Sequence, residues 1–352
     1  MAGAVLVGGY PALEPEPRIA RALAEGTLAG VTLFRRNVES PEQLRRTLLE
    51  LGSKCTAPPL FAIDQEGGRV ARLHAPFLKL PPMRVLGERG DLALTREAGQ
   101  VLGEQLAAVG VTMDFAPVLD VDTNPDNPVI GDRSFSRDPA EVARHGLAFA
   151  EGLMTGGCLA CGKHFPGHGD TDQDSHLALP HLAHDLERLA RVELAPFRAA
   201  TSLPALMTAH VVFSAFDAER PATLSSRVLR GLLREELGFE GLIISDDLEM
   251  KAVSRRWSIP ESACLAIEAG ADLLLVCSDV DALFAAREAL AARASAERAF
   301  AERLRDAAAR SLELRRSRPP TPLGSAQELE KLLCSERARR LERTLSATED
   351  AT

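Results

Sequence analysis

The chain has 352 residues, and 41 Lys and Arg against 50 Asp and Glu give it a formal net charge of −9. Its 45% hydrophobic and 26% charged residues are typical of a globular protein and exclude a disordered or fibrous one. Nucleic-acid-binding proteins meet phosphates with Lys and Arg and stack bases on aromatic rings. The acidic balance and the 4% aromatic content therefore argue against a nucleic-acid partner.

The first residues, MAGAVLVGG, lack a basic flank, and their apolar run is shorter than the core of an export signal. No stretch approaches the roughly 18 apolar residues of a membrane-spanning helix. The six cysteines are scattered along the chain, as expected of reduced thiols. We therefore expect a cytoplasmic monomer without a membrane partner.

Eight short apolar runs alternate with helical patterns along the first 280 or so residues. They are continuously apolar rather than alternating, as strands buried on both faces are. This order predicts a single (β/α)8 barrel of the TIM type. A doubly wound sheet is the alternative, but no early strand is followed by its G-x-G-x-x-G phosphate loop. The predicted strands are 4–8, 30–34, 60–63, 111–115, 158–163, 205–209, 241–245 and 272–277.

Helices are predicted between these strands, and two have clear start signals. Ser40-Pro41 and Asp138-Pro139 each place a capping residue before a first-turn proline. Beyond Asp281 the chain is rich in Ala, Arg and Glu, which predicts a helical carboxyl-terminal extension. We expect a barrel domain over 1–315 and, over 316–352, a Pro-containing linker with one solvated helix at 325–345 and no assignable role. Examples of the predicted inter-strand helices are 41–51, 92–108, 139–154, 186–200, 226–237 and 259–269.

Polar side chains gather where the predicted strands end. Since the carboxyl ends of barrel strands converge on one face, these clusters predict an active site there. The clusters are 64–72, 116–120 and 130–135, the dense stretch 163–176, His210, and 245–247.

These residue types suit the hydrolysis of a glycosidic bond by double displacement. One carboxylate attacks the anomeric carbon while another group protonates the leaving oxygen. Asp246, at a strand end, is the candidate nucleophile, and His176, oriented by Asp174, is the candidate acid. The candidate sugar-binding groups are the donors Arg72, Arg133, Lys163 and His164 and the acceptor Asp64.

The stretch KHFPGHGDTDQDSH (163–176) resembles the signature of glycoside hydrolase family 3. It is most similar to that of the bacterial β-N-acetylglucosaminidases of peptidoglycan recycling. IDQEGGRVARL (63–73), NPVIGDRSFSRDP (127–139) and GLIISDDLEM (241–250) agree with that family in order and spacing. The resemblance covers roughly residues 1–290.

The resemblance implies a (β/α)8 barrel and a retaining mechanism through a covalent glycosyl-aspartate on Asp246. It assigns the acid and base to His176, paired with Asp174, and sugar binding to Asp64, Arg72, Arg133, Lys163 and His164. It also implies cytoplasmic removal of terminal GlcNAc from GlcNAc-1,6-anhydro-MurNAc, with or without its peptide. We expect neither a metal nor a cofactor. We expect the chain to differ from many family β-glucosidases by having no second α/β domain.

Several alternatives remain open. A β-glucosidase or a GlcNAc phosphorylase would use the same residues, and a non-catalytic sugar-binding relative would keep only the binding groups. A metal-dependent barrel hydrolase is a further alternative, with ligands drawn from His164, His168, Asp174, His176, His210 and Asp246. We expect Glu66 to order its own turn. Strand periodicity does not say whether Asp246 or Asp247 faces inward, and Asp246 could instead cap the following helix with Glu249.

Overall fold

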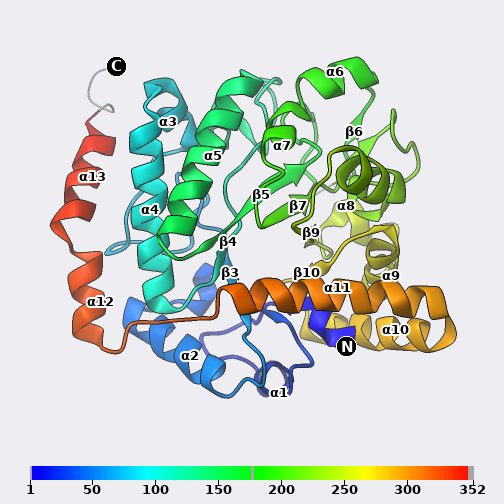
Figure 1. The fold of residues 1–352 in the computed structure, drawn as a ribbon, viewed down its shortest axis with the longest axis horizontal. Coiled ribbons are helices and arrows are strands. Elements are labelled where there is room, and N and C mark those ends of the chain that lie inside the picture. The colour runs from blue at the N-terminus through cyan, green and yellow to red at the C-terminus, as the bar shows by residue number, and fades with distance from the viewer. Residues whose placement is uncertain (1, 176–177, 348–352) are drawn as a thin grey trace.

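The computed structural model describes residues 2–175 and 178–347. All eight predicted strands are present, and they pair in parallel to close a barrel in the order β1-β10-β9-β7-β5-β4-β3-β2. The (β/α)8 fold is therefore confirmed (Figure 1). The barrel strands are β1 (Leu6–Gly8), β2 (Gly30–Leu33), β3 (Leu60–Ile63), β4 (Met113–Asp114), β5 (Leu159–Phe165), β7 (Ala205–Thr208), β9 (Leu242–Asp247) and β10 (Leu273–Val276).

The strands are buried on both faces, which explains their continuously apolar sequences. Successive side chains alternate between the barrel interior and the layer of helices. On β3, Leu60 and Ala62 belong to the interior cluster, whereas Phe61 and Ile63 pack outward. On β9, Leu242 and Ile244 are interior. This alternation determines which residue beyond each strand end faces the axis of the barrel.

Helices surround the barrel, and the predicted start signals hold in the structure. The Ser40 hydroxyl accepts a hydrogen bond from the Gln43 N–H, and the Asp138 carboxylate accepts one from the Ala140 N–H. The helices as far as β10 are α1 (Pro17–Ala24), α2 (Pro41–Ser53), α3 (Met83–Arg89), α4 (Leu92–Val109), α5 (Pro139–Thr155), α6 (Leu186–Arg191), α7 (Ala195–Ala199), η5 (Arg227–Glu236, a π-helix), α8 (Lys251–Ser254) and α9 (Ile259–Ala269).

Within the barrel domain, two elements differ from the sequence prediction. The single helix expected at 186–200 is two short helices, α6 and α7. Pro196 lies in the first turn of α7, and proline disfavours continuation of the preceding helix. The structure also contains a short parallel pair outside the barrel, β6 (His181–Leu182) with β8 (Val212–Phe213), which the sequence did not indicate.

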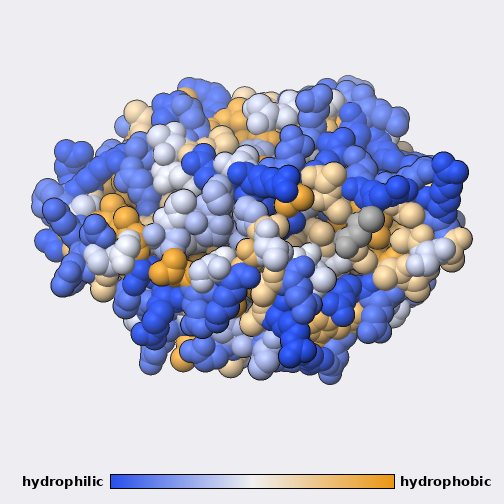
Figure 2. Space-filling view, turned by 60° about the horizontal axis from the view of Figure 1, so that its bottom comes forward, coloured by the Kyte–Doolittle hydropathy of each residue, from blue (hydrophilic) through white to orange (hydrophobic). Residues whose placement is uncertain are grey.

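The carboxyl-terminal extension begins with α10 (Val280–Ala296) and α11 (Arg298–Ser317). Helix α11 runs across the amino-terminal ends of the strands (Figure 1). Arg303 donates to the carbonyl of Ala271 just before β10, and Arg315 donates to that of Pro58 before β3. Seen from this end, the surface is largely hydrophilic with small separate apolar groups (Figure 2). Helix α11 thus closes the end of the barrel opposite the polar clusters.

The last part of the chain was wrongly predicted as one solvated helix. It forms α12 (Ala326–Leu333) and α13 (Glu336–Ser346), because the Ser335 hydroxyl caps a new helix by accepting a hydrogen bond from the Ala338 N–H. The two helices lie along α2 and α4 (Figure 1). They bury Leu329, Leu333, Ala338, Leu341 and Leu345, so the segment packs against the barrel domain.

Among residues 2–175 and 178–347, no helix combines the length and the apolar composition needed to cross a membrane.

Candidate active site

A pocket of about 140 Å³ opens at the carboxyl ends of the strands. Asp64, Lys163 and Asp246 each continue the inward-facing set of their strand: Asp64 follows Leu60 and Ala62, Lys163 follows Leu159 and Cys161, and Asp246 follows Leu242 and Ile244. Residues of distant sequence segments therefore converge on one cavity. Its lining comprises Asp64, Glu66, Val70, Arg72, Val129, Arg133, Lys163, His164, His168, Ser175, Met207, Asp246 and Met250.

Six of the predicted site residues are thus brought together: Asp64, Arg72, Arg133, Lys163, His164 and Asp246. Lys163 and His164 are adjacent in sequence, yet both line the pocket. On β5, Gly162 pairs with Leu206 and Phe165 with Thr208, so the strand carries one extra residue at this point. Such a bulge lets consecutive side chains face the same way.

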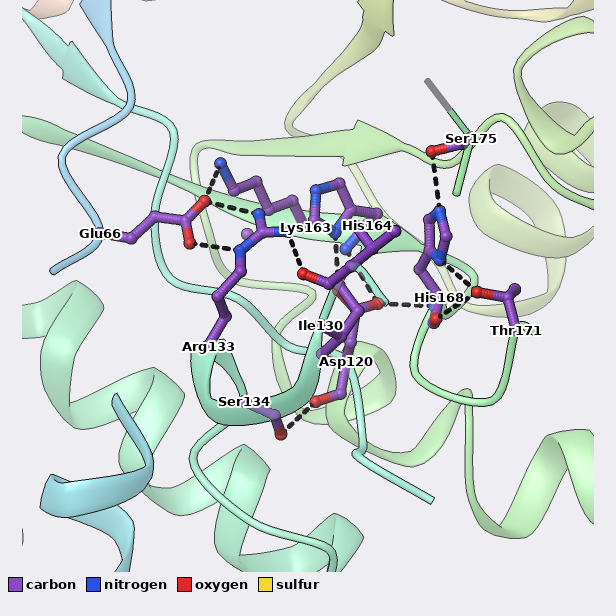
Figure 3. Close-up of polar contacts among 12 residues, drawn as sticks. Glu66, Asp120, Ile130, Arg133, Ser134, Lys163, His164, His168, Thr171 and Ser175 are labelled. Atoms are coloured by element: carbon purple, nitrogen blue, oxygen red, sulfur yellow. Dashed lines mark hydrogen bonds and ion pairs between the residues drawn. The ribbon is translucent and has the colours of Figure 1, made fainter. Parts of the chain in front are cut away.

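The charged groups of the pocket form one ion-pair network. The Lys163 ammonium lies 2.7 Å from Asp64 Oδ1 and 2.5 Å from Glu66 Oε1. The Arg133 guanidinium is bidentate on Glu66, with both N–O distances at 2.8 Å (Figure 3). Arg72 Nη2 lies 3.2 Å from Asp64 Oδ2. Cations and anions therefore alternate around the wall of the pocket.

This pairing keeps the buried groups ionised. Burial raises the pKa of Glu66, but the charges of Arg133 and Lys163 outweigh it and hold that pKa well below its usual range. Burial likewise lowers the pKa of Lys163, and Asp64 and Glu66 reverse the effect, so the net pKa is raised. The pocket consequently presents fixed charges, as recognition of a polar ligand requires.

Asp120 holds His164, near the end of β5, and His168, in the loop that follows. Its Oδ2 lies 2.6 Å from His164 Nδ1, and its Oδ1 accepts hydrogen bonds from the backbone N–H groups of His164 and His168 (Figure 3). Burial raises the pKa of Asp120, but the pairing with His164 lowers it overall. A buried carboxylate on Nδ1 leaves His164 Nε2 as the ring nitrogen available to a ligand.

His168, whose role the sequence left open, both braces the loop and lines the pocket. Its ring nitrogens lie 2.8 Å from the Thr171 hydroxyl and 3.0 Å from the Ser175 hydroxyl. Burial, reinforced by nearby His164, lowers the pKa of His168 to about 4, so the ring is neutral at pH 7. Asn127 Nδ2 donates to the His168 carbonyl at 2.8 Å. The first part of the loop that follows β5 is therefore held in place.

Glu66 was wrongly expected to order its own turn. Gln65 does so instead: its N–H donates to Asp114 Oδ1, and its Oε1 accepts from the N–H groups of Arg72 and Leu73. The side chain of Glu66 is directed to Arg133 and Lys163. A signal for this existed in the sequence, since Glu66 shares the parity of Asp64 on the inward side of β3.

Asp246 faces the pocket and Asp247 packs behind it, which settles the orientation that periodicity left open. The proposed capping box of Asp246 with Glu249 is absent from the described contacts; the Glu249 N–H donates to Asp247 Oδ1 at 3.1 Å. Asp247 Oδ1 also accepts from the Cys277 N–H at 3.3 Å, and His210 Nε2 lies 3.0 Å from the Asp247 carbonyl oxygen. These contacts anchor the end of β9, from which Asp246 projects.

We predict that Asp247→Asn stabilises the protein at alkaline pH. Burial, with the nearby charge of Glu249, raises the pKa of Asp247 to about 7. Because the folded state binds this proton more tightly than the unfolded chain, stability is lost as the pH rises from about 4 to about 7. Asparagine stays neutral and keeps the acceptor oxygen. Thermal unfolding should show a gain of roughly 2–6 °C at pH 8 and little change at pH 5; equal shifts at both pH values would contradict the assignment.

Asp174, the predicted partner of His176, lies near the end of the described part of the loop that follows β5. Asp174 is partly exposed and, within the described residues, is not part of the pocket lining. His176 lies outside the described residues. Ser175, between them, lines the pocket, and its carbonyl accepts a hydrogen bond from the Ala252 N–H at 3.1 Å. The chain is therefore tied to α8 immediately before His176.

For the alternative of a metal centre, the described ranges 2–175 and 178–347 contain no group of three or more His, Cys, Asp or Glu side chains arranged to hold a metal ion.

The pocket residues that the sequence prediction missed are Glu66, Val70, Val129, Ser175, Met207 and Met250. Met207 follows the inward parity of Ala205 on β7, and Glu66 follows that of Asp64, whereas the other missed residues carry no such signal.

Comparisons with known proteins identify the family to which the chain belongs. A family model described as the glycosyl hydrolase family 3 N terminal domain matches residues 6–314. The β-hexosaminidase of Neisseria meningitidis serogroup B is 42% identical over 275 residues, which cover 76% of each chain. That of Methylococcus capsulatus is 43% identical over 274 residues, 76% of this chain and 81% of the relative.

Solved structures agree with these relatives. A family 3 β-N-acetylglucosaminidase from Paenibacillus sp. is 40% identical with a TM-score of 0.92, and the match covers 98% of this chain and 67% of that one. NagZ from Neisseria gonorrhoeae, in complex with N-trifluoroacetyl-D-glucosamine, is 33% identical with a TM-score of 0.82, covering 98% and 97%. With the barrel and the pocket described above, these matches show that the chain belongs to glycoside hydrolase family 3, among its β-hexosaminidases.

Proposed function

We propose that this protein is a retaining exo-β-N-acetylglucosaminidase. Its substrate is a peptidoglycan fragment, GlcNAc-1,6-anhydro-MurNAc with or without its peptide, and it removes the terminal non-reducing GlcNAc. The observation that carries the proposal is the convergence of Asp246 with five predicted sugar-binding residues on one small, charged pocket.

The pocket chemistry favours an N-acetylated sugar. Arg133, Lys163 and His164 offer buried donors for hydroxyl and carbonyl oxygens, and Asp64 offers an acceptor. The gonococcal relative binds an N-acyl glucosamine, which supports the same ligand here. A site built to pair polar groups strongly rejects analogues that lack them.

In the proposed mechanism, the Asp246 carboxylate attacks the anomeric carbon as the bond to the leaving oxygen breaks. His176, supported by Asp174, donates a proton to that oxygen. Water then attacks the anomeric carbon of the glycosyl-aspartate and gives a proton to His176. The bond to Asp246 breaks, and GlcNAc leaves with the β configuration retained. No cofactor is needed for either step.

We also propose a cytoplasmic location and a monomeric enzyme. The free thiols of all six cysteines favour a reducing compartment.

The rate on p-nitrophenyl β-GlcNAc should exceed that on p-nitrophenyl β-glucoside by about a hundredfold or more, because the glucoside leaves acetamide-binding groups unpaired. Equal rates on the two substrates would overturn the proposed specificity. Digestion of GlcNAc-1,6-anhydro-MurNAc, followed by NMR, checks both the natural substrate and the retained anomeric configuration. The same assay with added phosphate should yield free GlcNAc; formation of GlcNAc 1-phosphate would instead identify a phosphorylase.

A further inference from the structure

Glu66 lines the pocket, and both of its carboxylate oxygens accept hydrogen bonds from pocket cations. It is not among the residues proposed to bind the sugar or to carry out catalysis. The residue is 2% exposed. Its Oε2 accepts from Arg133 Nε, and its Oε1 accepts from Arg133 Nη2 and from the Lys163 ammonium (Figure 3). A buried carboxylate shared by two cations in a ligand pocket constrains both of them.

The contacts to carboxylates and to one carbonyl occupy only some of the N–H donors of Arg133 and Lys163. Arg133 has five N–H groups, and contacts to Glu66 and to the Val129 carbonyl use three of them. Lys163 has three, and contacts to Asp64 and Glu66 use two. The orientation of the remaining N–H groups is therefore set by the carboxylates that hold the others.

We infer that Glu66 is a positioning residue for sugar binding, which orients Arg133 and Lys163 so that their remaining N–H groups face the ligand. This inference rests on the proposed function. Without Glu66, the flexible Lys163 side chain would keep only Asp64, and the guanidinium would lose the bidentate contact that fixes its plane. The donors would remain in the pocket with poorly defined directions. The affinity for the sugar would then fall more than the rate of the chemical step.

The test compares Glu66→Gln with a matched buried carboxylate away from the pocket. Asp272 is 1% exposed and pairs with Arg234 and Arg303 at the opposite end of the barrel. Glu66→Gln should raise the KM for p-nitrophenyl β-GlcNAc and the inhibition constant of free GlcNAc roughly tenfold or more, with a smaller change in kcat. Asp272→Asn should lower the melting temperature and leave both constants at their wild-type values.

Glu66→Asp provides a second variant that keeps the charge and withdraws the carboxylate by one methylene. It should fold even if Glu66→Gln does not, and it should give an inhibition constant between those of the wild type and Glu66→Gln. Wild-type values of both constants in either folded Glu66 variant would overturn the inference and leave Glu66 a structural residue. If the wild-type protein itself neither binds nor releases GlcNAc, the proposed function has failed instead.

Discussion

Replacing Asp246 by asparagine should lower turnover by about three or more powers of ten, because the amide cannot form the glycosyl-enzyme. The fold and GlcNAc binding should survive, since the Asp246 side chain projects into the pocket from an anchored strand end. Steady-state kinetics, thermal unfolding and GlcNAc binding measure these three properties.

The neighbouring residue provides the matched control. Asp247→Asn should keep turnover within about tenfold of the wild type, because Asp247 packs behind the pocket. A fluorinated substrate analogue that traps the intermediate should label Asp246, as shown by peptide mass. A label on Asp247, or appreciable turnover by Asp246→Asn, would show that the nucleophile is wrongly assigned even though the family is correct.

The second large effect concerns His176. His176→Ala should slow cleavage of the natural disaccharide by about two to four powers of ten, because its sugar leaving group needs protonation. The loss of kcat/KM on nitrophenyl substrates should be much smaller, since nitrophenolate leaves without a proton and kcat/KM excludes the later step in which His176 acts as base. Asp174→Asn should show a milder version of the same pattern, as expected of a residue that orients the imidazole.

The exposed histidine His181 is the control for this experiment, and His181→Ala should change neither substrate class. An equal loss on both classes by His176→Ala would instead indicate a structural role. Rates on a series of aryl leaving groups make the comparison quantitative, because the dependence on leaving-group acidity should steepen only when the acid is removed.

The eight strands, the barrel and the location of the polar clusters could be predicted because they rest on local properties. Continuous apolar runs identify doubly buried strands, and parallel order places their carboxyl ends together. Asp64, Arg72, Arg133, Lys163, His164 and Asp246 were selected on that basis, and all line the pocket. Their individual roles were inferred from residue chemistry together with the resemblance to a family, and they stay predictions.

Other features depend on contacts between segments far apart in the chain. Strand parity placed Glu66 on the inward side, but its role in the pocket could not be read from the sequence, because its partner Arg133 lies 67 residues away. The tail could not be distinguished from a solvated helix until its apolar side chains were seen against the barrel domain. In each case, contacts with residues far away in the sequence decide the structure: an ion pair for Glu66 and apolar packing for the tail.

The two aspartates of β9 show most simply which features follow from the sequence and which require the tertiary structure. The sequence by itself determined that Asp246 and Asp247 end a buried strand and point to opposite sides, because strand side chains alternate. Only the tertiary structure decided which side is inward, since Leu242 and Ile244 join the interior cluster while Ile243 packs against the helices. The direction of a side chain relative to the barrel axis depends on closure of the whole sheet, and no local property of the strand contains it.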